Sequence, residues 1–230
     1  MLYVTHPIWD SQEKQGLFTY IERTLTEEFN EKKPMQGIYT RNWKSYKWYR
    51  DGAPVLEDMH LPDHLIMVCK GIRRFQHDFF ADDLRQWIIS AKFRDFLRSH
   101  NLLEGHYEES QLTVVSTKNQ PLAEQPYYLW RLFRHDNALV DFEKTPRVVS
   151  PVKPFTEYTP PKVYYPELMF QNQAQVPDLF YLDDPNYWSS FFCNEEIKLA
   201  MEKENFLGFD FYSLKEYMRV CIEQEEKGRI

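Results

Sequence analysis

The chain has 230 residues, of which 43% are hydrophobic, 17% aromatic and 27% charged. This length suffices for one large domain or two small ones with a buried core. The net charge of −7 argues against direct nucleic-acid binding, which depends on Lys and Arg. It fits a basic protein partner, or solubility alone. The seven glycines are too widely spaced for the Gly-rich loops that hold phosphates and dinucleotides.

The N-terminal sequence and the cysteines predict a cytoplasmic protein. The stretch MLYVTHPIWD lacks the basic region and apolar run of a signal peptide, and the apolar runs are far shorter than the ~20 residues that span a bilayer. The three cysteines, Cys69, Cys193 and Cys221, are odd in number and far apart, which argues against disulfides and zinc binding. We expect no metal, no cofactor and no membrane partner.

Residues 1–75 are expected to form an aromatic-rich N-terminal region. Alternating and apolar segments predict short strands here, and helix-forming residues predict one helical stretch. The predicted elements are a strand or helix start at 17–21, a helix over 24–29 ending before Pro34, strands at 37–39 and 43–49 with a turn at Asp51-Gly52, and a buried strand at 65–69.

Residues 76–150 are expected to hold a first strand-helix-strand unit. A short strand at Ile88-Ile89 leads into a helix that ends near His100. Ser90 is a good N-cap residue, and Phe93, Phe96 and Leu97 have helical spacing. Gly105 ends this unit, and strands are predicted at 111–116 and 127–133.

Residues 151–230 are expected to hold a Pro-rich connection and a second unit. Six prolines between 146 and 166 exclude a continuous helix or a central strand. Beyond them the sequence predicts a strand at 179–182, a helix at 194–203, a strand at 206–212 and a helix at 214–227. The whole is predicted to be one compact α+β domain, a mixed β-sheet with packed helices, containing two related strand-helix-strand units.

The two units share their spacing. Ser90 lies as far before Gly105 as Cys193 lies before Gly208, and each pair brackets a predicted helix. A glycine after a helix permits the positive φ that turns the chain into the next strand. The pattern predicts that residues 88–108 and 191–211 superpose. The alternative is that the two segments share a common strand-helix-strand pattern by chance or convergence.

Several phrases in this arrangement resemble bacterial polymorphic-toxin immunity proteins, most closely the immunity protein 43 type and the related immunity protein 11 group. The phrases are Ile88 to Gly105, Tyr127-Tyr128-Leu129, Val140 to Thr145, and Leu179 to Phe211. The resemblance covers roughly residues 80–213. It implies a cytoplasmic protein that binds and neutralises a cognate toxin domain, and it brings no catalytic residues with it.

Candidate catalytic and metal-binding residues are few. His60 and His64 have the spacing of two ligands on one helix face, but Pro62 between them favours a polar loop over a metal site or hydrolase. His77-Asp78 and His135-Asp136 are adjacent only in sequence, which does not build an acid-base pair. Cys193 stands at a helix start, where a thiolate would be stabilised, yet the repeat places it at a capping or buried position.

Two binding functions are open. Arg41 to Arg50 interleaves cations with aromatics, as in single-strand nucleic-acid binding, so a nucleic-acid-associated or regulatory module is the alternative to an immunity protein. A toxin that acts on nucleic acid, such as a basic nuclease, would favour carboxylates beside aromatic anchors. The predicted partner-binding residues are Asp183, Asp184, Tyr187 and Trp188, with Glu108 and Glu109 as a weaker choice.

Overall fold

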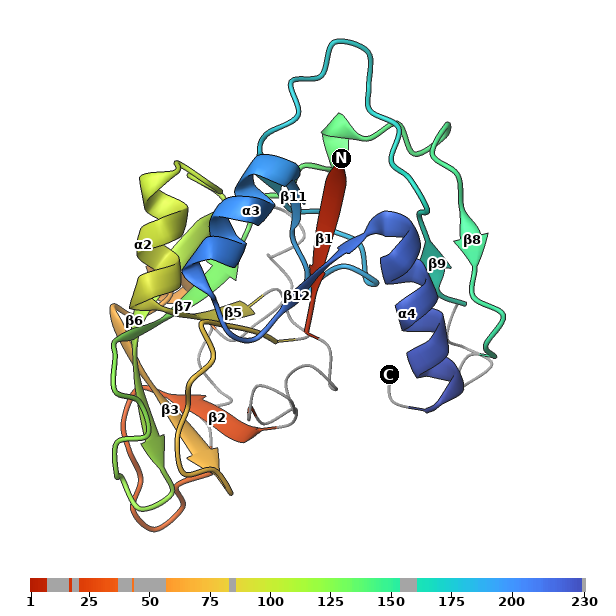
Figure 1. Ribbon diagram of the computed structural model, residues 1–230. Coiled ribbons are helices and arrows are strands. Elements are labelled where there is room, and N and C mark those ends of the chain that lie inside the picture. The colour runs from red at the N-terminus through yellow and green to blue at the C-terminus, as the bar shows by residue number, and fades with distance from the viewer. Residues whose placement is uncertain are drawn as a thin grey trace. The chain divides into compact units, whose positions relative to one another are not determined.

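The computed structural model describes residues 1–7, 17, 21–36, 43, 57–82, 86–153 and 161–228. Strands and helices are mixed along the chain (Figure 1), and the predicted α+β fold with a mixed sheet is confirmed. The chain divides into two compact units. Unit 1 comprises residues 1–6, 135–204 and 210–230, and unit 2 comprises residues 7–134 and 205–209. The regions 1–75, 76–150 and 151–230 stay a prediction.

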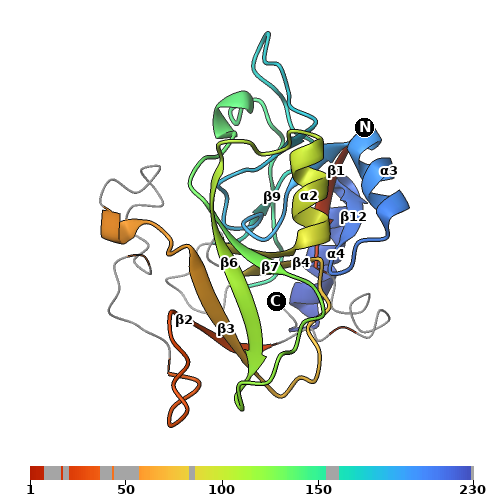
Figure 2. The same ribbon diagram turned by 90° about the vertical axis from the view of Figure 1, so that its left-hand side faces the viewer.

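Unit 2 is built on a six-stranded sheet with the order β2-β3-β6-β7-β5-β4. The β3–β6 pair is parallel and the other pairs are antiparallel, so the sheet is mixed. Helix α2, Ala91–Ser99, lies against β5 and β7 (Figure 2). The strands are β2 Glu22–Thr26, β3 His64–Lys70, β4 Phe79–Asp82, β5 Gln86–Ser90, β6 Tyr107–Ser116 and β7 Tyr127–Leu132, and a short 3-10 helix, η3, spans Glu57–Met59.

Local sequence signals account for much of unit 2. The apolar run predicted as a strand at 65–69 lies within β3, where it is mostly buried. The Ser90 hydroxyl accepts a hydrogen bond from the Phe93 backbone N at 3.1 Å, so the predicted N-cap is confirmed. The strands predicted at 111–116 and 127–133 correspond to β6 and β7.

The predicted helix over 24–29 is wrong. Strand β2 occupies Glu22–Thr26 and pairs antiparallel with β3. Thr24 and Thr26 are β-branched and suit a strand. Pairing with β3 also supplies backbone hydrogen bonds, whereas a helix as short as six residues is unstable by itself. The strands predicted at 37–39 and 43–49 lie outside the described residues, apart from Trp43.

Unit 1 contains a four-stranded antiparallel sheet with the order β10-β11-β1-β12. The N-terminal strand β1 therefore sits between two strands from the end of the chain. Helix α3, Glu195–Glu204, lies against β11 and β1, and helix α4, Leu214–Glu226, lies against β1 and β12 (Figure 1). The other elements are β1 Leu2–His6, η4 Asn137–Leu139, β8 Val148–Val149, β9 Val163–Tyr164, β10 Leu179–Phe180, β11 Phe192–Asn194 and β12 Asp210–Ser213.

The two segments compared above each form a strand, a helix and a strand. In each, the two strands are separated in their sheet by a third strand that runs antiparallel to both, β7 in one and β1 in the other. The second helix is capped by Asn194, whose side-chain oxygen accepts from the Ile197 backbone N at 2.9 Å. Asn194, and not Cys193, thus occupies the position of Ser90. The superposition of residues 88–108 on 191–211 stays a prediction.

A buried histidine predicts how the stability of unit 1 depends on pH. The pKa of His6 is lowered from 6.5 to about 4, chiefly by burial, with a contact with Gln224 that raises it and nearby Lys162 that lowers it. Between pH 6.5 and 4 the unfolded chain takes up a proton that the folded protein does not, so stability falls as pH falls. We expect a loss of about 2–3 kcal/mol from this group between pH 7 and 4.5.

The measurement is urea unfolding across this pH range for the wild type and for His6→Phe, which retains a ring beside Tyr217 (5.1 Å between ring centroids). The variant should have a lower stability at pH 7 but a flatter pH dependence. Parallel curves for the two proteins would show that His6 is not held neutral by burial.

Candidate partner-binding surface

His60 and His64 contact different residues in the described structure. His64 begins β3, and its Nε2 lies 2.7 Å from the Thr113 hydroxyl, whereas the Nδ1 of His60 lies 3.0 Å from a carboxylate oxygen of Glu108. Among the residues that the structure describes, no three His, Cys, Asp or Glu side chains gather as a metal site. Each histidine has a local polar partner that accounts for its position.

The carboxylates of the two His-Asp dipeptides hold the fold together. Asp78 is buried, and its oxygens accept from the Ser90 hydroxyl at 2.6 Å and from the Leu207 backbone N at 2.9 Å. Asp136 accepts from the Tyr181 backbone N at 3.0 Å. These oxygens are engaged by backbone and capping groups, so they are not directed at a substrate.

Unit 2 contains a hollow of about 430 Å³ beside Asp78. Its lining includes Arg74, Lys92 and Tyr127 but no histidine, cysteine or serine. Arg74 pairs with Glu124 at 3.6 Å across its exposed rim. The hollow therefore lacks the Ser-His or Cys-His pair of an activated hydroxyl or thiol nucleophile.

Cys193 is buried in strand β11. Burial raises the pKa of its thiol to about 12, so the thiol stays protonated at neutral pH. A reactive cysteine needs an accessible thiolate. Of the two expected positions, capping or buried, the structure gives the buried one.

The predicted partner-binding residues Glu108 and Glu109 are engaged within unit 2. Glu108 accepts from Arg131 at 2.6 Å, and Glu109 accepts from the Trp130 indole N at 2.8 Å and from Arg98 at 3.2 Å. A partner would have to compete with these bonds. Their role at an interface stays a prediction. The contacts that the structure shows join side chains of the neighbouring strands β6 and β7.

The loop that holds the other predicted residues is a folded turn of unit 1. Tyr187 is 0% exposed and stacks on Tyr165, so it packs in the core. Asp184 accepts from the Tyr165 hydroxyl at 2.9 Å, and Asp183 accepts from the Trp188 indole N at 2.8 Å. Asp183, Asp184 and Trp188 remain partly exposed, and their role in partner binding stays a prediction.

Charge is divided unequally between the two units. Unit 1 has 17 acidic and 10 basic residues in its sequence, and unit 2 has 18 of each. Unit 1 thus carries the whole net charge of −7. Opposite net charges on two proteins speed their association and favour complementary partners. The net charge of unit 1 therefore suits a basic partner.

Exposed apolar side chains show the same division. The large hydrophobic side chains that are exposed among the described residues are Met1, Val149, Met169, Val176 and Leu199, and all belong to unit 1. Leu199 lies on α3 between Ile197 and Met201, which are buried. Since two residues span about 200° of a helix, Leu199 points away from the buried stripe. Sequence reasoning missed this residue, although its position in the helical pattern was readable.

These features describe an α+β protein with an acidic, partly apolar surface and no assembled catalytic or metal centre among its described residues. The family model described as Immunity protein 43 matches residues 10–224, and the chain belongs to this family. No curated protein matches the sequence. No helix among the described residues is long and apolar enough to cross a membrane.

Proposed function

We propose that this protein neutralises a cognate bacterial toxin domain by binding it in the cytoplasm of the producing cell, without catalysis. The observation that carries the proposal is the family match over residues 10–224. The unequal charge supports it, because a toxin that acts on nucleic acid needs a basic surface and unit 1 has a net charge of −7. Unit 2 has no net charge, so it has no net electrostatic attraction for the phosphates of nucleic acid. This does not favour the alternative of a nucleic-acid-associated module.

Co-expression tests this function. The toxin domain encoded beside this protein should stop growth when expressed alone, and growth should return when the full chain is co-expressed. The two proteins should co-purify as a stable complex, because neutralisation by binding requires high occupancy. An unrelated toxin domain serves as the control and should not be neutralised.

Rescue with no stable complex would contradict the binding mechanism. In that case the intact mass and the amount of toxin domain should be measured, since modification or degradation of the toxin would indicate an enzyme. Failure to rescue growth would contradict the proposed function itself.

A further inference from the structure

The segment from Gln171 to Asp178 is an exposed loop of unit 1, and we call it the 171–178 loop. Figures 1 and 2 both show it standing out beyond the strands of this unit. Four of its eight side chains are uncharged amides, and Val176 is 38% exposed within it. Amides both donate and accept hydrogen bonds, so the loop offers polar contacts and an apolar one.

The start of the 171–178 loop is firmly held. The Gln171 backbone N donates to the Leu139 carbonyl at 2.8 Å, and the Asp141 backbone N donates to the Met169 carbonyl at 2.7 Å. Phe170 forms an isolated β-bridge with Val140. A loop fixed at its base loses less conformational entropy when it binds a partner.

The end of the 171–178 loop is fastened to helix α3. Asp178 accepts from Asn194 twice, through its backbone carbonyl at 2.9 Å and its carboxylate at 2.6 Å. Asn194 is also the residue that caps α3. Leu199 is five residues further on, about 7.5 Å along the helix axis, so the loop ends at the N-terminus of the helix that carries Leu199.

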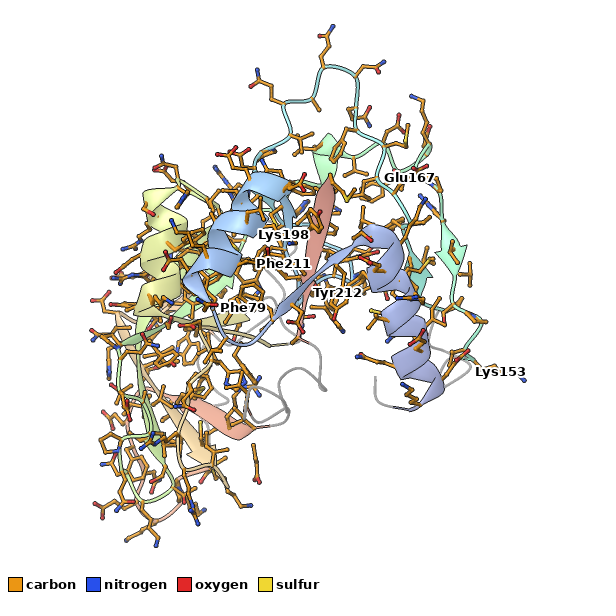
Figure 3. All side chains as sticks on the ribbon, in the orientation of Figure 1. Phe79, Lys153, Glu167, Lys198, Phe211 and Tyr212 are labelled. Atoms are coloured by element: carbon orange, nitrogen blue, oxygen red, sulfur yellow. The ribbon has the colours of Figure 1, made fainter. Side chains whose placement is uncertain are left out.

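The exposed face of α3 combines an apolar centre with carboxylates. Leu199 is 57% exposed, and the residues around it that are exposed as well are Glu195, Glu196, Glu202 and Lys203. The Lys198 ammonium is bound within unit 1, because its Nζ lies 2.6 Å from Glu202 and 5.1 Å from the centre of the Tyr3 ring. Figure 3 shows Lys198 beside Phe211 on the neighbouring strand.

We infer that the 171–178 loop and the Leu199 face of α3 form one docking surface for a basic protein, the toxin domain. This inference rests on the proposed function. Leu199 and Val176 would supply apolar contacts, while the carboxylates would steer the encounter. A second copy of this chain is the poorer fit, because two units of net charge −7 repel each other. Nucleic acid is repelled for the same reason.

Binding kinetics with the neighbouring toxin domain test the surface. Leu199→Ala and Val176→Ala in the full chain should each raise Kd about tenfold or more, mainly through a faster off-rate. The matched control is Val149→Ala. Val149 is also 57% exposed in unit 1 but lies on β8, and its Kd should stay within about twofold of wild type.

The carboxylates should act on the on-rate. Replacing Glu195 and Glu196 together by Gln should slow association several-fold and reduce its dependence on salt, while Glu226→Gln at the end of α4 should change it little. Thermal melts should be nearly unchanged for all these exposed positions, so a weaker complex would report the interface.

The outcomes separate this inference from the proposed function. If the wild type does not bind the toxin domain, both fail. If the wild type binds but Leu199→Ala and Val176→Ala bind equally well, only the surface is wrong. A loss of affinity for Trp188→Ala alone would place the interface on the 183–188 loop. If light scattering shows a wild-type dimer that Leu199→Ala dissociates, the surface belongs to a second copy.

Discussion

Gly208→Ala should lower the free energy of unfolding by about 4 kcal/mol or more. Gly208 has φ +115, which an L side chain rarely adopts, and an added Cβ would lie 2.1 Å from the Phe79 carbonyl oxygen. That oxygen belongs to the backbone of strand β4, so it cannot rotate away as a side chain would. Relief of the clash requires a shift of segment 205–209. Asp78 holds this segment by two hydrogen bonds with Leu207, because its backbone N donates to the Leu207 carbonyl and its carboxylate accepts from the Leu207 backbone N.

Two other glycines provide matched controls for this substitution. Gly71 also has a positive φ, +83, but an added Cβ would meet nothing within 4 Å. At Gly105, with φ +73, the near atom is the end of the Arg134 side chain at 3.2 Å, which can move. Alanine at either position should cost about 1–2 kcal/mol. Urea unfolding followed by circular dichroism measures all three, and equal losses would show that φ alone sets the cost.

Gly105 and Gly208 also show what a sequence pattern can and cannot predict. Both were predicted as turn glycines after a helix, and both have positive φ. The tight approach of Phe79 to Gly208 joins residues far apart in sequence, so no local pattern contains it. Similarly, β3 and the Ser90 cap follow from local signals, whereas β2 depends on its partner strand, as does the place of β1 between β11 and β12.

The candidate surface was predictable in part. Residues 1–134 are electrically balanced and the remainder carries the net charge of −7, so the asymmetry was visible in the sequence. Leu199 was visible as the position opposite Ile197 and Met201 in the predicted helix. The internal bonds of Asp183 and Asp184 were not, because they depend on how one turn folds on itself and on Tyr165. An acidic phrase in the sequence therefore shows where carboxylates gather, but not which of them are already bonded within the fold.

Arg131→Met should lower the free energy of unfolding by about 3–5 kcal/mol. Arg131 is 0% exposed, and it stands opposite Glu108 on the neighbouring strand. Its guanidinium donates to the Trp43 carbonyl at 2.7 Å, to the Met59 carbonyl at 2.6 Å and to Glu108 at 2.6 Å. Removal of the cation leaves the two carbonyls without this donor, and it leaves the Glu108 carboxylate with only its contacts to His60 and the Leu61 backbone N. Loss of one partner is the costly outcome for a buried pair.

A double-mutant cycle separates the ion pair from the loss of side-chain packing. Glu108→Gln removes the charge but retains an acceptor, so it should cost less than Arg131→Met, and the double variant should cost less than the sum of the single ones by about 2 kcal/mol. Arg98→Met is the control for an exposed pair. Its guanidinium lies 3.2 Å from Glu109 but its side chain is half exposed, so it should cost under about 1 kcal/mol. Additive losses at Arg131 and Glu108, in urea unfolding, would mean that the two charges stabilise unit 2 independently, and that the carbonyls of Trp43 and Met59 are the partners that matter.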